Sequence, residues 1–339
     1  MNDVPHIPGV LTADEIRRSG AQLASLQLPS GMIPWFPGGH CDPWNHVESA
    51  MALDVAGLHT EALAAYRWLA ETQRSDGSWH NYYLPDGSIE DTKLDSNVCA
   101  YVATGVFHHW LTTREDTVAR ELWPTVVAAL EWVLSMRRAD GTILWAREVD
   151  DVPWDYALLT GSSSIRHALH CGAALGGMLG DPQPCWRAAA DRLDVVIQQH
   201  PESFEPKTRW AMDWYYPVLG GALRGDAAKA RLTDKWDEFV MERHGVRCVS
   251  DEPWVTASET AECALAFAAI GDAATATDLL AWIAVHRLED GSYYTGIVYP
   301  DGVRFPFDER TSYTAAAVVL AADGIAAATP ASQLFVTPV

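Results

Sequence analysis

The sequence predicts an all-α protein whose single domain is an (α/α)6 toroid, a ring of inner helices surrounded by a ring of outer helices. Three observations predict it. A turn with glycine followed by an aromatic residue recurs along the 339-residue chain. An amphipathic stretch precedes each turn, and a stretch rich in small and apolar residues follows it. Helices that are apolar nearly all round are buried nearly all round, so the alternation indicates two concentric rings. An open helical solenoid is the alternative, and complete units at both ends of the chain favour closure.

The repeated turn sets the repeating unit. Its strongest copies are QRSDGSW, from Gln73 to Trp79, and LEDGSYY, from Leu288 to Tyr294; weaker copies end at Trp35, Trp145, Trp210 and Trp254. Glycine supplies the tight or left-handed backbone that ends a helix. We expect the aromatic residue to fill the gap between neighbouring helix pairs. This structural role accounts for Gln73, Gly77 and Trp79.

The outer helices are predicted from amphipathic spacing. The first opens with a capping-box pattern, Thr12 with Glu15 three residues on. The second places Leu63, Tyr66 and Leu69 on one face. The predicted outer helices are 12–27, 59–73, 119–136, 185–198, 226–243 and 272–286.

The inner helices are predicted from stretches in which small and apolar residues dominate. The predicted inner helices are 42–57, 95–110, 162–179, 213–225, 256–271 and 310–324. We divide the chain into an N-terminal extension (1–11), the toroid (12–326) and a C-terminal tail (327–339).

Composition restricts the partners and the compartment. The net charge of -21 disfavours nucleic acid and anionic membranes, because like charges repel. We expect no membrane span, since no apolar run reaches the necessary length, and no signal peptide at the N-terminus. The six cysteines are scattered without a CxxC pair, which is typical of reduced thiols in a cytoplasmic protein.

Two family resemblances follow from these motifs. QRSDGSW resembles the Gln-x-x-Asp-Gly-x-Trp repeat of terpenoid cyclases and protein prenyltransferase β-subunits, which are α/α toroids. The wider layout, with DGSWHNYYLPDGS leading to Asp91 or Asp95 and then PWDYALLTGSSSIRHAL, resembles six-hairpin glycosidases of the glucoamylase kind. Both resemblances imply the same architecture and differ in chemistry.

The chain departs from each family at the catalytic motif. The Asp-x-Asp-Asp motif of class II terpene cyclases is missing, and Cys263 follows Glu262 without a histidine at a place that matches the prenyltransferase zinc site. In the comparison with glycosidases, Asp155 stands after Trp154 where a Trp-Glu acid is expected. We therefore expect no metal and no cofactor.

Polar residues near the starts of the inner helices are the candidates for chemistry, because these helix ends converge on one rim of a toroid. The candidate catalytic residues are Asp155, Glu259, Glu48, Asp95 and Asp213. The candidate substrate-binding residues are Trp44, His46, Asp91, His167, Trp214, Tyr215, Trp254, Glu262, Asp308, Arg310 and Tyr313. Some of these residues have an ordinary structural explanation, as Asp95 does, because it is a good N-cap. Glu48, Glu259 and Glu262 do not, since they lie in helices predicted to be buried, where an unpartnered carboxylate is costly.

Carboxylates beside large aromatic side chains favour a carbohydrate substrate. Glycoside hydrolysis needs two carboxyl groups, and we expect Asp155, Glu259 or Glu48 as the proton donor, with Asp95 or Asp213 as a base or hydroxyl ligand. A sugar epimerase or isomerase is a close variant, in which His46 and His167 matter. The alternatives are a terpenoid-cyclase-like or prenyltransferase-like enzyme acting on an isoprenoid, and a non-catalytic binding toroid.

Overall fold

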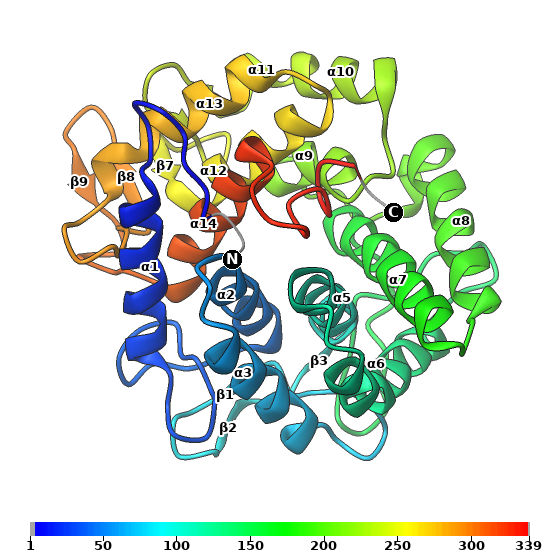
Figure 1. Ribbon diagram of the computed structural model, residues 1–339. Coiled ribbons are helices and arrows are strands. Elements are labelled where there is room, and N and C mark those ends of the chain that lie inside the picture. Colours follow the sequence, from blue (N-terminus) through cyan, green and yellow to red (C-terminus); the bar gives the residue numbers. More distant parts are fainter. Residues whose placement is uncertain (1–3, 338–339) are drawn as a thin grey trace.

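The helices form a closed double ring (Figure 1). The structure is a computed structural model that describes residues 4–337; residues 1–3 and 338–339, the outer ends of the predicted extension and tail, lie outside the described residues. The inner ring is α2 (Pro43–Val55), α5 (Val102–Thr113), α7 (Leu159–Leu179), α9 (Ala211–Leu219), α12 (Ala257–Ala269) and α14 (Ser312–Ala326). Helix α14 packs against both α12 and α2. The last inner helix therefore closes on the first, which confirms the toroid and excludes the open solenoid.

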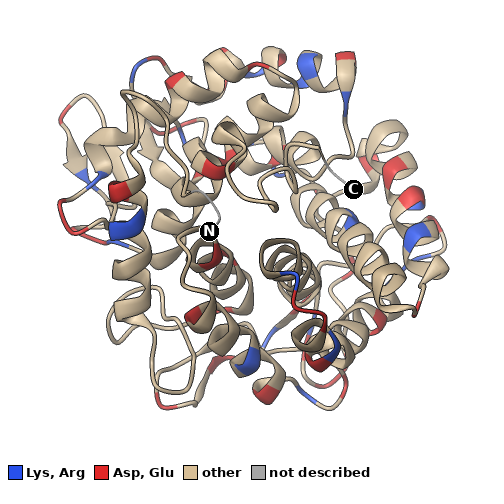
Figure 2. Cartoon of the chain, viewed as in Figure 1, with Lys and Arg blue, Asp and Glu red and all other residues tan. Residues whose placement is uncertain are grey.

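The outer ring consists of α1 (Ala13–Leu26), α3 (His59–Thr72), α6 (Asp116–Ser135), α8 (Pro184–Gln199), α10 (Gly225–Asp234) and α13 (Ala273–Trp282). The predicted capping box is present: the Thr12 side chain accepts a hydrogen bond from the Glu15 backbone N–H, and the Glu15 side chain accepts one from the Thr12 backbone N–H. Outer helices bury one stripe, whereas nearly all of α14 is buried. Figure 2 shows charged residues mainly on the outer helices and connections. The amphipathic and apolar patterns thus sort the helices correctly.

Glycines with positive φ make the repeated turns, as predicted; they are Gly31, Gly77, Gly141 and Gly291, with φ of +95°, +98°, +100° and +91°. At Gly77 an added Cβ would lie 2.2 Å from the carbonyl oxygen of Ala128, so the neighbouring outer helix leaves no room for a side chain. Gln73 Nε2 donates to Gly77 O (2.9 Å) and Thr125 O (3.0 Å). This glutamine therefore joins one helix pair to the next.

Two predicted helices are interrupted. The helix predicted over 95–110 divides at Tyr101 into α4 (Ser96–Ala100) and α5. The helix predicted over 226–243 ends after α10 and the short α11 (Trp236–Phe239). There β5 (Val240–Met241) turns back on β6 (Gly245–Val246). Gly245 has φ +132° and sits against Thr260, which favours this hairpin over a continued helix.

Short antiparallel strands, which the sequence did not predict, brace the connections into the inner helices. Strand β1 (Tyr82–Tyr83) pairs with β2 (Ile89–Asp91), and β3 (Leu94–Asp95) pairs with β4 (Ala146–Arg147). A three-stranded sheet orders β7 (Trp254–Thr256), β8 (Gly296–Val298) and β9 (Val303–Arg304). The 3-10 turns are η1 (Pro201–Ser203) and η2 (Ile283–His286). These long connections gather at the end of the ring where the inner helices begin.

The other end of the ring carries short connections and the segment after α14. That segment crosses the middle of the ring, shown in red in Figure 1. Ala331 and Leu334 are buried, and the Phe335 ring stacks on His167 with centroids 5.0 Å apart. In residues 4–337 no helix is long and apolar enough to span a bilayer. All six cysteines are free thiols, and all but Cys185 are buried.

Candidate active site

A cavity of about 230 Å³ opens where the inner helices begin. Helices α2, α9, α12 and α14 each contribute side chains to it. It is lined by Trp35, Trp44, Asn45, Glu48, Met212, Ser258, Glu259, Glu262 and Tyr313. The structure thus brings five predicted site residues together, namely Trp44, Glu48, Glu259, Glu262 and Tyr313. They form a hollow lined by both carboxyl groups and aromatic side chains.

Glu48 lies one turn into α2 and is buried. The hydroxyl of Tyr101 donates to Glu48 Oε1 over 3.0 Å. Burial raises the pKa of Glu48 to about 8, although the Tyr101 hydrogen bond acts in the opposite direction. The Trp44 ring stacks on Tyr101 at 4.7 Å and covers this pair. Glu48 is therefore a proton-bearing carboxyl group at neutral pH.

Glu262 faces the same cavity from α12. It accepts hydrogen bonds from the hydroxyl groups of Tyr215 and Tyr216, the latter at 3.2 Å. Burial raises the pKa of Glu262 well above its usual value, and the negative charge of Glu48 raises it further. Two buried carboxyl groups that repel each other cannot both be ionised at low cost, so the pair holds a proton.

Glu259 lies one turn before Glu262 on the same face of α12. Its exposure is intermediate, and Ser258 Oγ donates to Glu259 Oε2 over 2.7 Å. It is the most accessible carboxylate of the cavity. The three glutamates together offer a proton-bearing acid and a second, more accessible carboxyl group, and glycoside hydrolysis requires two carboxyl groups.

Trp35, Asn45 and Tyr101 belong to this site but are not among the candidates that the sequence predicts. Trp35 Nε1 donates to Asp42 Oδ2 over 2.7 Å, and Asn45 Nδ2 donates to the same oxygen over 2.6 Å. Asp42 also caps α2 through the backbone N–H of Asn45. Tyr101 falls within a stretch predicted to be a buried apolar helix. Its signal was a lone tyrosine among small residues, since a buried hydroxyl needs a polar partner.

Asp95 and Asp91 are not among the residues that line the cavity. Asp95 caps α4, accepting from the backbone N–H groups of Asn97 (3.0 Å) and Val98 (3.2 Å), and it also accepts from Trp145 Nε1. Asp91 accepts from Asn81 Nδ2 over 2.8 Å. Their oxygens therefore have structural partners.

Asp155 and Asp213 line a different depression. The Asp155 side chain is 91% exposed and pairs with Arg138. Asp213 is buried and accepts from Thr160 Oγ1 over 2.9 Å. Neither lines the cavity that holds Glu48 and Glu259. Asp155 lies on the exposed connection before α7, and Asp213, although it is in α9, is held by Thr160 at the start of α7.

Three predicted binding residues are packing residues in the structure. The ring of His46 lies between Ile33 N (3.1 Å) and Ala65 O (2.9 Å). The indole N–H of Trp214 donates to Arg231 O over 2.8 Å. His167 is buried under Phe335 at the far end of the ring. Tyr215, by contrast, contacts the site, because its hydroxyl group donates a hydrogen bond to Glu262.

The remaining predicted residues lie on surface connections. Asp308 pairs with Arg304 at 2.9 Å, and Arg310 pairs with Asp290 at 3.5 Å. Trp254, on β7, lines a separate groove on the same face as the glutamates.

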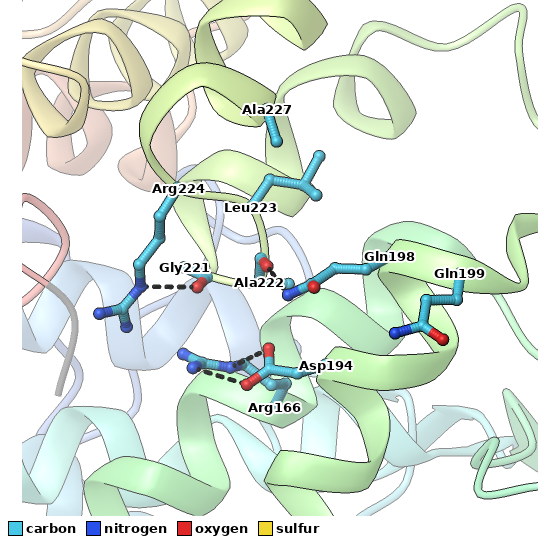
Figure 3. A pocket seen from close by; sticks show the side chains of 9 residues that line it. All are labelled: Arg166, Asp194, Gln198, Gln199, Gly221, Ala222, Leu223, Arg224 and Ala227. Carbon is cyan, nitrogen blue, oxygen red and sulfur yellow. Dashed lines mark hydrogen bonds and ion pairs between the residues drawn. The ribbon is translucent and has the colours of Figure 1, made fainter.

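A larger cavity of about 710 Å³ lies at the opposite end, between α7, α8 and the connection after α9 (Figure 3). Arg166 donates from Nε and Nη2 to the two oxygens of Asp194, over 2.8 and 3.0 Å. Asp194 is the one carboxyl group among the residues lining this cavity. Because it is neutralised by Arg166, the cavity lacks the carboxyl pair needed for glycoside chemistry.

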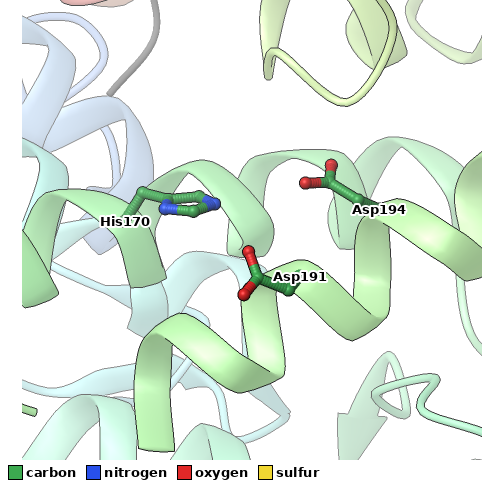
Figure 4. Close-up of side chains that lie close together, drawn as sticks. All are labelled: His170, Asp191 and Asp194. Atoms are coloured by element: carbon green, nitrogen blue, oxygen red, sulfur yellow. The ribbon is translucent and has the colours of Figure 1, made fainter. Parts of the chain in front are cut away.

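His170, Asp191 and Asp194 place possible metal-ligand atoms within 4.8 Å of one another (Figure 4). Burial, and then the charges of Arg166 and nearby arginines, lower the pKa of His170 to about 4. The same positive charges oppose a bound cation, and Asp194 is already paired. We therefore do not assign a metal to this cluster.

Comparison with solved structures places the fold among glycosidases. A glycosidase in complex with glucose superimposes with a TM-score of 0.74 at 13% identity, covering 94% of this chain and 97% of that chain. A GH63 mannosylglycerate hydrolase from Thermus thermophilus, in complex with glucose, gives a TM-score of 0.69 at 12% identity, covering 91% of this chain and 99% of that one. At these identities the likeness concerns the fold. No protein-family model matches the chain.

Fold, cavity and relatives define the chain as an α/α-toroid enzyme of the glycoside hydrolase kind. A relative of known activity identifies the family within this class. The chain is 50% identical over 335 residues to the MMP endo-(1,4)-3-O-methyl-alpha-D-mannosidase of Mycolicibacterium hassiacum, covering 99% of this chain and 92% of that protein. The chain belongs to the family of that enzyme.

Proposed function

We propose that this chain is an endo-acting α-mannosidase that hydrolyses (1,4) linkages in a polymer of 3-O-methylated mannose. The 50% identity to an enzyme of that name, over nearly the full length of both chains, supports the substrate class. The cavity at the start of the inner helices supports the chemistry, because it gathers three glutamates and several aromatic faces. We also propose that the enzyme works in the cytoplasm, in keeping with its six free thiols.

The observation that carries the mechanism is the buried pair of carboxyl groups. In our proposal a proton held by the Glu48 and Glu262 pair passes to the glycosidic oxygen as the bond from that oxygen to the anomeric carbon breaks. Glu259 is the second carboxyl group, because it is the less buried one and accepts from Ser258 Oγ. Water supplies the hydroxyl group that ends on the anomeric carbon, and its other proton returns to the carboxyl groups, so that the acid is restored. Trp44 and Tyr313 offer apolar faces to the sugar ring.

The test uses the purified chain and a 3-O-methylated (1,4)-mannose polymer. We expect products from internal cleavage, seen as a rapid fall in mean chain length before monosaccharide accumulates. Glu262→Gln, Glu48→Gln and Glu259→Gln each lower kcat/KM by about 10²-fold or more. Glu121→Gln is the control, since Glu121 forms an exposed ion pair with Arg67 on the outer surface. A folded wild-type chain that leaves the polymer intact contradicts the proposal.

The isoprenoid alternative stays a prediction. The carboxyl-rich lining of the cavity supports a sugar instead, and turnover of a prenyl diphosphate or a polyprene by the purified chain is the result that would favour the alternative.

A further inference from the structure

A second groove, of about 360 Å³, includes Trp254 just before the start of α12. The cavity lined by Glu48, Glu259 and Glu262, which we call the catalytic cavity, lies at the same end of α12. Its lining is mainly apolar and aromatic. It is formed by Arg209, Trp210, Val249, Glu252, Trp254, Val298 and Phe305. Trp210 and Phe305 are 43% and 53% exposed, which is unusual for side chains of this size. We call Trp210, Trp254 and Phe305 the aromatic platform.

The platform adjoins the catalytic cavity through two short segments. Trp210 immediately precedes α9, and Met212, two residues later, lines the cavity. Trp254 begins β7, which leads directly into α12, where Ser258 and Glu259 line the cavity. A polymer held at Glu259 therefore has the platform beside it.

Contacts within the connections fix the platform in place. Trp254 Nε1 donates to Phe305 O over 2.9 Å, and the two rings meet edge to face at 5.3 Å. The backbones of Trp210 and Val249 pair in an isolated antiparallel β-bridge, and the Arg209 guanidinium lies 5.5 Å from the centre of the Trp210 ring. A surface that is already ordered loses little conformational entropy on binding.

The chemistry of the groove selects against ordinary polar or anionic ligands. The Arg209 charge is already paired with Asp251 at 2.9 Å. Glu252 adds a negative charge, so an anion gains nothing here. Removing a free hydroxyl group from water against an apolar wall is costly, whereas a methyl ether has no O–H donor to leave unpaired. Aromatic faces and the valines suit methyl groups and the C–H face of a sugar.

We propose that the aromatic platform is a binding subsite for a methyl-ether-bearing sugar unit of the substrate chain, one located away from the bond that is cleaved. This inference rests on the proposed function and deepens it, because it assigns recognition of the methyl groups to Trp210, Trp254 and Phe305.

Binding is measured by calorimetry in the Glu262→Gln background, with two (1,4)-mannose oligosaccharides of equal length, one 3-O-methylated and one unmethylated. We expect the methylated ligand to bind at least tenfold more tightly. Trp210→Ala and Phe305→Ala should each weaken its binding about tenfold and reduce the preference for methylation. Phe307→Ala is the matched control, because Phe307 is 87% exposed on the same connection and does not line the groove. Circular dichroism and thermal unfolding verify that each variant is folded.

Equal affinity for the two ligands overturns the subsite, as does unchanged binding by folded Trp210→Ala and Phe305→Ala. Those results leave the proposed function standing provided that the wild type cleaves the methylated polymer. Failure of the wild type to cleave it, in a parallel assay, is a separate result that contradicts the proposed function instead.

Discussion

Removing the hydrogen bond from Tyr101 to Glu48 tests whether Glu48 sets the upper pH limit of activity. Tyr101→Phe removes the only polar atom that the side chain offers and retains the ring that stacks on Trp44. A hydrogen bond to a charged group contributes about 1.5–3 kcal/mol. Because one pH unit corresponds to about 1.4 kcal/mol, losing the bond raises the pKa of Glu48 by about 1–2 pH units above its value of about 8.

The measurement is kcat/KM on the methylated polymer from pH 5 to pH 10. In the wild type we expect activity to fall above about pH 8, as the acid loses its proton. In Tyr101→Phe the fall begins about 1–2 pH units higher. Tyr66→Phe is the control, since the buried Tyr66 hydroxyl has no hydrogen-bond partner within the described residues. An unchanged or lowered upper limit in Tyr101→Phe refutes the assignment of Glu48 as part of the acid.

Three further predictions concern stability. Gly77→Ala should lower the free energy of unfolding by about 2–5 kcal/mol, because of backbone strain and the clash with Ala128. Gly87→Ala is the control, since Gly87 has positive φ but open space around it, and it should cost about 1–2 kcal/mol. Thermal unfolding of the two variants makes the comparison. Asp54→Asn should cost about 3 kcal/mol, because fully buried Asp54 accepts hydrogen bonds from histidines, and urea titration measures this. The folded chain keeps the Glu48 proton to higher pH than the unfolded chain does, so the free energy of unfolding of the wild type should fall by up to about 4 kcal/mol between pH 4.5 and 8. Glu48→Gln should flatten that decline. Urea titrations at several pH values measure it, and an equal dependence of stability on pH in the wild type and the variant would contradict the prediction.

Much of the fold could be predicted from local sequence because each repeat carries its own signals. The capping box at Thr12, the glycine turns and the contrast between half-polar and apolar helices all act within a few residues. The interruptions at Tyr101 and before Val240 could not be predicted in this way. They depend on contacts with distant segments, such as the packing of Gly245 against Thr260.

Some of the residues that line the candidate site could be predicted for a similar reason. Glu48, Glu259 and Glu262 could be identified because a carboxyl group inside an apolar helix requires an explanation. The direction in which a rim connection projects has no comparable local signal. Asp155 therefore looked equivalent to Glu259 in the sequence, although it pairs with Arg138 in solvent. The partnership of Trp35 with Asp42 joins a turn to a helix start, and only the folded rim shows it.

The segment after α14 packs across the middle of the ring, with Phe335 stacked on the buried His167, and this bears on how the polymer of our proposal would be bound. Because Leu334 of this segment is buried in the hydrophobic core between the inner helices, a polymer cannot pass through the middle of the ring. A polymer bound at Glu259 therefore has to enter and leave the cavity on the side where the inner helices begin. A free chain end is then unnecessary for binding, so the geometry allows cuts in the middle of a chain.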